Sequence, residues 1–392
     1  MDRREFLQWS GAFAASGLLL RDIPSVDAVI QDAPALGGMP MLQNPTDSGV
    51  TVLIPVNRLS TAWVEYGSTP SLGQTAIPLE YGLHPLNARI HKIKITGLKP
   101  GQPLYYRVHV AGIDFKGPYQ IKRLATESTD ILRTKTLNPH IDTAQVAFIN
   151  DTHEKADVLG ALGDRLSVMK PDLVFWNGDV FNDVRSDDQI FRQFVNPSKA
   201  AFAASSPIAF VSGNHDVHGV HARELSRFVD TPDDLRCYIL RQGPVAFVVM
   251  DTGEDKPDEH PVYAGLGGFA LYRRQQREWL ERALKTPVFR SAPYKILVCH
   301  IPFFNEWDSP DSREQWMGLL REAGVRLAIH GHVHEPSLTL KGGEVPWIQM
   351  IGGGPSMDSA TIIEAKADRS QLKVVMRNLQ GKTIHEAEVP HP

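Results

Sequence analysis

The strongest constraint on the fold is a series of apolar segments that each end in a short polar motif. Five segments after residue 143 of the 392-residue chain show this pattern, namely "AQVAFIN", "DLVFWNGD", "PIAFVSGNHD", "YKILVCH" and "VRLAIHG". Stretches with helical periodicity, such as "ADVLGALGDRLSVM" and "RRQQREWLERAL", lie between some of them. Apolar strands that alternate with helices predict an α/β domain in which helices cover the sheet faces.

The polar motifs carry side chains that are suited to binding metal ions. Ligands of α/β proteins bind just beyond the carboxyl ends of the strands, so motifs at successive strand ends are expected to lie close together. Each motif alone is a common turn sequence, but their joint order indicates a metal site. Mixed oxygen and nitrogen ligands suit divalent ions such as Zn, Mn, Fe or Ni. The residues concerned are Asp151, His153, Asp179, Asn214, His215, Asp216, His300, His332 and His334.

The first half of the chain predicts short strands separated by turns. The segments "GVTVLIPV", "TAWVEYG", "RIHKIKITGL" and "PLYYRVHV" alternate or run apolar, and turn residues lie between them. This pattern predicts a small β-sandwich over residues 38–137. Its segment "GLKPGQPLYYRV" is similar to a corner of fibronectin type III domains, although Leu104 stands where the corner tyrosine is expected, with Tyr105 and Tyr106 after it.

The N-terminus resembles an export signal. The segment "MDRREFLQWSGAFAASGLLL" places Arg3 and Arg4 before a Gly- and Ala-rich apolar stretch that is too short to span a bilayer. Twin arginines at this position are typical of Tat signals, and an amphipathic helix is the alternative. We therefore expect a signal peptide over residues 1–35 and a soluble protein, exported to the periplasm or the extracellular space, without a membrane span.

Charge and cysteine content limit the classes of partner and the kinds of metal site that we expect. The formal net charge is −4 and no Lys/Arg block stands out, so we expect no platform for nucleic acid. Cys237 and Cys299 do not make a disulfide framework, and they exclude an all-thiolate metal site. Cys299 lies in the apolar run "KILVCH" and is expected to be buried, while a bridge to Cys237 stays open. The oligomeric state stays open as well.

The ordered set of motifs resembles that of the calcineurin-like metallophosphoesterases. Asp-x-His, Gly-Asp, Gly-Asn-His-Asp, His and Gly-His-x-His follow one another within residues 144–392, the expected catalytic domain. The resemblance implies a four-layer αββα sandwich and two metal ions, Zn, Mn or Fe, bridged by an aspartate and a solvent oxygen. Gly331 is expected to permit the turn that points the last two histidines at different ions. One ion is assigned to Asp151, His153, Asp179 and His334, and the other to Asp179, Asn214, His300 and His332.

The other histidines near the motifs have different expected roles. By the resemblance, His215 bonds the phosphoryl oxygen or protonates the leaving group, and Asp216 could orient it; a purely supporting role for His215 stays open. His218 and His221 either touch substrate or are solvated. His330 lies outside the Gly-His-x-His pattern, so we expect it to pack behind the ligands, with a substrate contact as the alternative.

A narrower resemblance is to purple acid phosphatases, which also place a fibronectin-like domain before the metallophosphoesterase domain. Those enzymes carry an iron-binding tyrosine after the Gly-Asp motif, at the position where this sequence has Asn182. They also lack the histidine of the first motif, which is present here as His153. We therefore expect no charge transfer between tyrosinate and iron.

Together the resemblances predict an enzyme that hydrolyses phosphate monoesters of small molecules by attack of a metal-bridging hydroxide on phosphorus. A phosphodiesterase acting on nucleotides or glycerophosphodiesters shares the same motifs and is the alternative. A third hypothesis is a surface binding protein with a vestigial metal site. It is disfavoured because every expected ligand is intact in the sequence.

Overall fold

The structure is a computed structural model that describes residues 33–195, 201–232, 235–304 and 311–391. The twin arginines and nearly all of the expected signal peptide lie outside the described residues. Within the described ranges, no helix is long and apolar enough to cross a membrane. Pro34–Pro392 form one compact unit.

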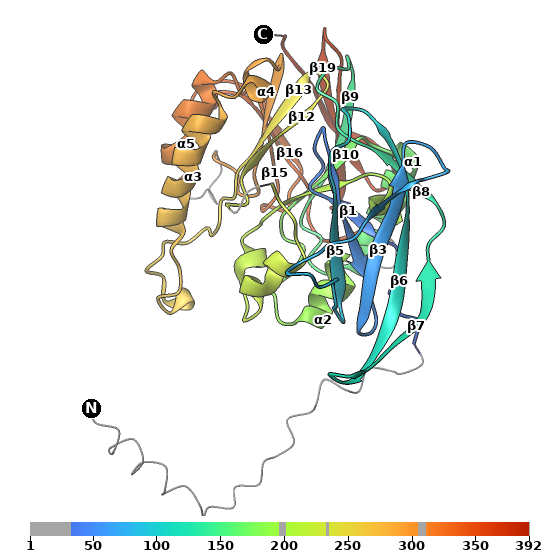
Figure 1. Cartoon of the computed structure of the whole chain (residues 1–392). Helices are drawn as coiled ribbons and strands as arrows, with labels where there is room; N and C mark the ends of the chain where they lie inside the picture. Colours follow the sequence, from blue (N-terminus) through green and yellow to red (C-terminus); the bar gives the residue numbers. More distant parts are fainter. Residues whose placement is uncertain (1–32, 196–200, 233–234, 305–310, 392) are drawn as a thin grey trace, which may run out of the picture. The chain divides into compact units, whose positions relative to one another are not determined.

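Two large sheets form the centre of this unit (Figure 1). Their buried side chains, including Phe148, Phe175 and Phe247, meet in one apolar core between the sheets. The first sheet has nine strands in the order β20 (Thr383–Val389), β19 (Leu372–Asn378), β18 (Thr361–Ala367), β9 (Ala144–Ile149), β10 (Leu173–Asn177), β11 (Ile208–Val211), β1 (Met41–Gln43), β2 (Val50–Pro55) and β5 (Ile90–Ile95). The second has six strands in the order β12 (Tyr238–Gln242), β13 (Val245–Val249), β14 (Tyr294–Val298), β15 (Leu327–His330), β17 (Ile348–Ile351) and β16 (Ser337–Thr339).

Helices cover the outer faces of both sheets. α1 (Ala156–Met169) packs on the nine-stranded sheet through an apolar stripe that includes Leu159, Leu162 and Leu166. α3 (Phe269–Ala283) and α5 (Ser312–Glu322) lie side by side and pack on the six-stranded sheet (Figure 1). This order of layers confirms the predicted αββα fold. The shorter helical segments are α2 (Asp187–Ile190), η1 (Phe191–Val195), η2 (Ala201–Ala204), η3 (His215–Val217), η4 (Ala222–Arg227), η5 (Pro261–Tyr263) and α4 (Pro287–Arg290).

The N-terminal region is all-β, as the sequence predicts, but one of its sheets is continuous with the catalytic sheet. β1 pairs in parallel with β11 through Gln43 and Ile208, so that β1, β2 and β5 extend the nine-stranded sheet. The domain boundary expected between residues 137 and 144 remains a prediction. A further sheet of five strands packs on this extension, with β4 (Gln74–Ala76), β3 (Ser60–Gly67), β6 (Pro103–Gly117) and β7 (Gln120–Ser128) in that order and β8 (Leu132–Lys135) beside β6.

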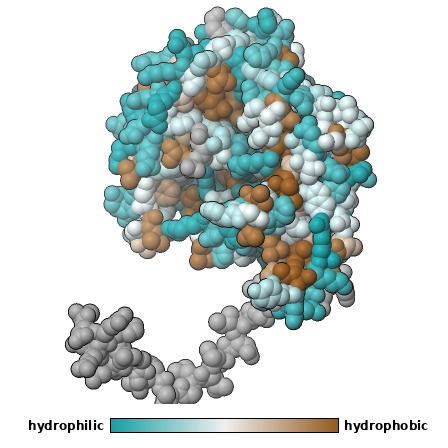
Figure 2. Space-filling view, in the orientation of Figure 1, coloured by the Kyte–Doolittle hydropathy of each residue, from teal (hydrophilic) through white to brown (hydrophobic). Residues whose placement is uncertain are grey.

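Apolar side chains are exposed at the free end of the β6–β7 hairpin, where Figure 2 shows a hydrophobic patch. Phe115 and Ile121 are 47% and 53% exposed, and with Trp63 they line a hollow on the five-stranded sheet. None of the predicted metal ligands lines this hollow. Cys237 and Cys299 are both buried and neither forms a disulfide, so the bridge left open by the sequence is not made.

Candidate metal centre

The predicted ligands come together because the strands before them end at the same edge. β9, β10 and β11 are parallel neighbours in one sheet, and β14 and β15 are parallel neighbours in the other. Parallel strands present their carboxyl ends together, and this edge is where α/β folds place ligands. The residues that follow these strands are, in chain order, Asp151, His153, Asp179, Asn214, His300, His332 and His334.

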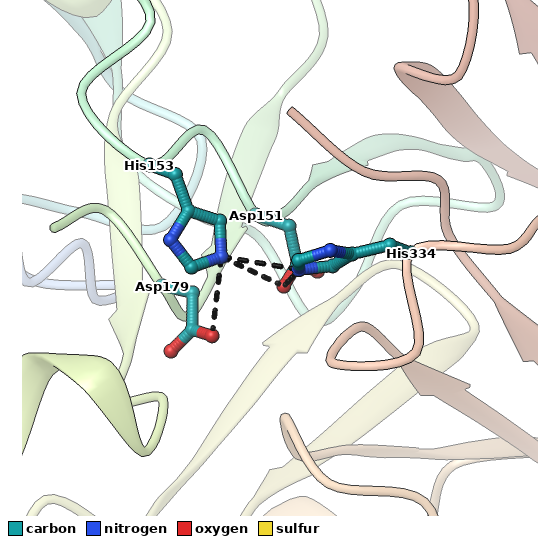
Figure 3. Close-up of side chains that lie close together, drawn as sticks. All are labelled: Asp151, His153, Asp179 and His334. Carbon is teal, nitrogen blue, oxygen red and sulfur yellow. Dashed lines mark hydrogen bonds and ion pairs between the residues drawn. The ribbon is translucent and has the colours of Figure 1, made fainter. Parts of the chain in front are cut away.

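Asp151, His153, Asp179 and His334 form the first group of possible metal ligands (Figure 3). Their ligand atoms all lie within 4.8 Å of one another. Nε2 of His153 is 3.1 Å from Nε2 of His334 and 3.5 Å from Oδ2 of Asp179. Nε2 of His334 is in turn 3.1 Å from Oδ1 of Asp151. Two imidazoles and two carboxylates that converge in this way are a donor set for a divalent cation.

Asp179, His300 and His332 form the second group, again with ligand atoms within 4.8 Å of one another. Nε2 of His300 is 3.1 Å from Oδ2 of Asp179. Nδ1 of His332 is 3.0 Å from the side-chain oxygen of Asn214, so the amide predicted as a ligand lies beside this group. Asp179 therefore belongs to both groups, which is the position that a bridging carboxylate requires.

His300 has bonding capacity that no described residue fills. The side chain is fully buried, and its Nδ1 donates a hydrogen bond to the carbonyl oxygen of Asn177 at 2.8 Å. This bond leaves Nε2 as the atom that faces the carboxylates, where its contact is the ion pair with Asp179 and no well-formed hydrogen bond satisfies it. A buried nitrogen without a hydrogen bond is costly, and a cation in contact with Nε2 and the carboxylates would satisfy it. The residues present therefore fit a metal ion.

The buried carboxylates of Asp151 and Asp179 favour positive charge beside Nε2 of His300. Burial acts to lower the pKa of His300, but the charges of Asp179 and Asp151 outweigh burial and raise this pKa to about 10. Burial acts to raise the pKa of Asp179, but His300 outweighs it and holds this pKa below its ordinary value. A site that holds a proton on a buried imidazole also stabilises a metal cation, which displaces that proton when it binds.

Five of the predicted ligands adopt the left-handed backbone conformation, which is rare for residues other than glycine. Such residues cost roughly 1–3 kcal/mol each and persist where the surrounding structure imposes them, which is often at functional sites. The clustering supports a functional site here. The φ values are 49° for Asp151, 42° for His153, 52° for Asp179, 72° for His332 and 65° for His334.

Gly331 is required for space and not for its backbone conformation. Its φ is not positive, and a Cβ atom at this position would collide with the carboxylate of Asp151 and come within 3.1 Å of Nδ1 of His300. Gly331 therefore permits the turn, as expected, through its lack of a side chain and not through a left-handed backbone. The left-handed residues at this turn are His332 and His334 themselves.

His215 lies beside the first group, with its ring centroid 4.9 Å from that of His153. Its Nδ1 donates a hydrogen bond to the carbonyl oxygen of Asn182 at 2.7 Å. The carboxylate of Asp216 instead accepts hydrogen bonds from backbone N–H groups, including that of Asp179 at 2.9 Å. The expectation that Asp216 orients His215 is therefore wrong, because Asn182 bonds the ring and Asp216 holds the loop that carries Asp179.

The remaining histidines lie outside both ligand groups. His330 is fully buried, with Nδ1 3.1 Å from the carbonyl oxygen of Cys299, and its ring packs near Phe303. It therefore lies behind the ligands, where the sequence places it. The backbone N–H of His221 donates to the carbonyl oxygen of Val184.

His218 forms an ion pair with Glu254, a buried residue that sequence reasoning missed. A signal for Glu254 existed, because it follows β13 in "VAFVVMDTGE" and β13 runs parallel to β14. The same rule that found the ligands at strand ends applies to this strand.

Comparisons with known proteins agree with the fold and with the family resemblance. A purple acid phosphatase from yellow lupin (Lupinus luteus) seeds is similar in structure, with a TM-score of 0.68 and 16% identity, over 90% of this chain and 74% of that one. PhoD is similar with a TM-score of 0.62 and 14% identity, over 91% of this chain and 90% of that one. At this identity the likeness supports the fold alone. No curated protein sequence matches the chain.

The family model for the calcineurin-like phosphoesterases matches residues 144–336. This region contains all the predicted ligands, from Asp151 to His334, and both groups that could hold a metal ion. The chain therefore carries a calcineurin-like phosphoesterase domain and belongs, through this domain, to the metal-dependent phosphoric ester hydrolases.

Proposed function

We propose that the chain is an exported phosphatase that uses two bound metal ions to hydrolyse phosphate monoesters of small molecules. The observation that supports this most directly is the shared position of Asp179, whose Oδ2 faces both His153 and His300. A carboxylate between two ligand groups suits a pair of ions about 3.5–4 Å apart. Such ions, when bound, activate water and stabilise the charge that develops on the phosphoryl group.

The protein's own side chains prepare the site for these ions. Oδ2 of Asp151 accepts hydrogen bonds from the side chain of Asn150 and from the backbone N–H of His332, which leaves Oδ1 facing the other ligands. His215 is fixed through Nδ1, so its Nε2 is the atom left for substrate. We assign Nε2 the contact with a phosphoryl oxygen or the transfer of a proton to the leaving alcohol.

We propose that the two ions come from Zn, Mn and Fe, because the donors are imidazole nitrogens together with carboxylate and amide oxygens. No tyrosinate ligand is expected. Asn182 stands at the position of the iron-binding tyrosine of purple acid phosphatases, and its side chain donates to the carbonyl oxygen of His153 at 3.4 Å. A coloured tyrosinate complex should therefore be absent after loading with iron.

The test is a direct comparison of two substrates. The full chain is depleted of metal, reloaded with Zn, Mn or Fe ions, and assayed with p-nitrophenyl phosphate and bis(p-nitrophenyl) phosphate. We expect two ions per chain and faster hydrolysis of the monoester. Faster hydrolysis of the diester would make the protein a phosphodiesterase. Fewer than one ion per chain, with no hydrolysis of either compound, would favour the surface binding protein.

Export is a separate part of the proposal, and it rests on Arg3 and Arg4, which lie outside the described residues. A reporter fused to residues 1–40 should be exported only while both arginines are present. Equal export of a version with Lys at both positions would refute the Tat assignment. Tat export of a folded protein would suit a site that is loaded before transport.

A further inference from the structure

A cavity of about 660 Å³ lies next to the candidate metal centre. The two sites meet at His218, which lines the cavity and whose ring centroid is 5.3 Å from that of His215. The η3 turn connects them in the sequence, because it begins at His215 and is followed directly by His218. A group attached to a phosphoryl group at the metal centre is therefore within reach of this cavity.

Glu254 places a carboxylate in the wall of this cavity, although its side chain is fully buried. Helix α3 fixes the segment that carries it. The guanidinium of Arg273 donates to the carbonyl oxygens of Thr252 and Glu254, and the side chain of Gln276 bonds both backbone groups of Asp251. Arg273 and Gln276 are themselves buried, so buried hydrogen bonds hold this wall in place.

Two polar groups of this wall have hydrogen-bonding capacity that is not filled. The carboxylate of Glu254 has the imidazole of His218 as its ion-pair partner, and no other described residue donates a hydrogen bond to it. The hydroxyl of Tyr263, which also lines the cavity, is buried and has no partner among the described residues. Burial, followed by the nearby Glu254, raises the pKa of Tyr263 above its ordinary value, so this hydroxyl stays protonated. Buried polar groups without partners are costly, so both favour a ligand that bonds them.

The charge on this wall favours a neutral ligand group. The contact with Glu254 raises the pKa of His218, which favours an ion pair without net charge between these two side chains. The remaining demand is for a donor to Glu254 and a partner for the Tyr263 hydroxyl, and an alcohol hydroxyl provides both. Val262, Leu266 and Phe269 supply apolar surface for the carbon part of the same ligand.

We propose that the cavity binds the alcohol part of the phosphate ester and that Glu254 and Tyr263 select alcohols with a further free hydroxyl group. The substrate class is therefore the phosphate monoesters of polyhydroxylated alcohols. This inference rests on the proposed phosphatase function. A hydrogen bond to a buried carboxylate is worth about 10- to 100-fold in kcat/KM against an analogue that lacks the hydroxyl.

The experiment compares glycerol 2-phosphate with isopropyl phosphate, which has the same carbon skeleton and no free hydroxyl on its carbons. The full chain is loaded with Mn²⁺, and kcat/KM is measured for both esters. Wild-type protein should prefer glycerol 2-phosphate by at least about 10-fold. Glu254→Gln and Tyr263→Phe should each reduce this ratio by about 5-fold or more, and Tyr263→Phe tests the proposal even where Glu254→Gln fails to fold.

Two exposed residues provide matched controls. Glu259 lies on the same loop, and Tyr81 is 97% exposed on the N-terminal region, so Glu259→Gln and Tyr81→Phe should keep the wild-type ratio. A wild type that hydrolyses both esters equally, or variants at Glu254 and Tyr263 that keep the preference, would overturn the assignment of the cavity and leave the phosphatase intact. A loaded wild type that hydrolyses neither ester, nor p-nitrophenyl phosphate, would overturn both.

Discussion

The Nε2 atom of His300 lies 3.1 Å from Oδ2 of Asp179, and both side chains are buried. The same Oδ2 is 3.5 Å from Nε2 of His153, which belongs to the other ligand group. The second oxygen, Oδ1, accepts the backbone N–H of His215 at 3.0 Å, so the carboxylate cannot rotate freely. Asp179 thus presents one oxygen to both groups. Two cations about 3.5–4 Å apart repel strongly, and an anion between them offsets that repulsion.

Asp179→Asn should abolish turnover, because the amide keeps the shape of the side chain but removes the charge between the two ions. We expect a loss of at least about 10³-fold in kcat, together with loss of one or both ions. Metal analysis of the purified variant and its rate with p-nitrophenyl phosphate provide the check. Asp164→Asn, at an exposed position on α1, is the control and should keep the wild-type metal content and the wild-type rate. Near-normal activity of Asp179→Asn would disprove a two-ion centre.

His215→Ala should lower kcat by about 10²–10⁴-fold while the metal content stays the same. The ring lies beside the ligand groups but belongs to neither, and its Nδ1 is bonded to Asn182. If His215 protonates the leaving group, the loss should be larger for an alkyl phosphate than for p-nitrophenyl phosphate, whose leaving group needs no proton. Loss of metal would instead make His215 a ligand. An equal loss on both esters would restrict its role to binding the phosphoryl oxygen.

The ligand set could be predicted from the sequence because its signals are local. Each ligand follows an apolar strand directly, and parallel strands bring their carboxyl ends together whatever the loops do. The assignment of Asp179 to both groups came from the family resemblance, and the geometry of the two groups is consistent with it. The division among the histidines of "HGHVH" likewise follows from position, since His330 still belongs to β15 while His332 and His334 lie beyond its end.

Other features depend on contacts that no local pattern encodes. The pairing of β1 with β11 joins Gln43 to Ile208, and nothing near either residue specifies the other as its partner. The bond between His215 and Asn182 depends on how two separate loops meet. Glu254 was missed for a different reason. It follows β13, but the polar residues after this strand do not match a family motif.

Removal of metal should destabilise the protein. The ligand groups bury carboxylates and hold five residues in the left-handed conformation, and bound ions compensate for both costs. At a metal concentration about 100-fold above Kd, binding adds about 2.7 kcal/mol. For a chain of this size, we therefore expect chelation to lower the thermal midpoint by about 3 °C or more. Calorimetry before chelation, after it, and after return of Mn²⁺ tests this. A midpoint that does not respond to metal would contradict it.

Asp230 lies just after η4 and connects this segment to the N-terminal strands. Two residues of η4, Ala222 and Arg223, line the cavity next to the metal centre. Its Oδ2 accepts hydrogen bonds from Asn44 at 2.9 Å and Thr51 at 2.6 Å. Asp230→Asn should lower the free energy of unfolding at pH 7 by about 1–3 kcal/mol, because these donors lose a charged acceptor. Urea unfolding measures this. Asp47→Asn, at an exposed site in the same region, should change it by less than about 0.5 kcal/mol.

The effect of Asp230→Asn should also depend on pH. Burial acts to raise the pKa of Asp230, but the hydrogen bonds from Thr51 and Asn44, together with Lys94 and Lys92, outweigh it and hold the pKa below the ordinary value of 3.8. A carboxyl whose pKa is lowered by folding stabilises the protein above the pKa of the unfolded chain. This contribution is lost as the pH falls through the folded pKa. The difference between wild type and variant should therefore be complete at pH 7 and shrink below about pH 4. A difference that stays constant down to pH 2 would show that the charge of Asp230 does not hold these two parts of the fold together.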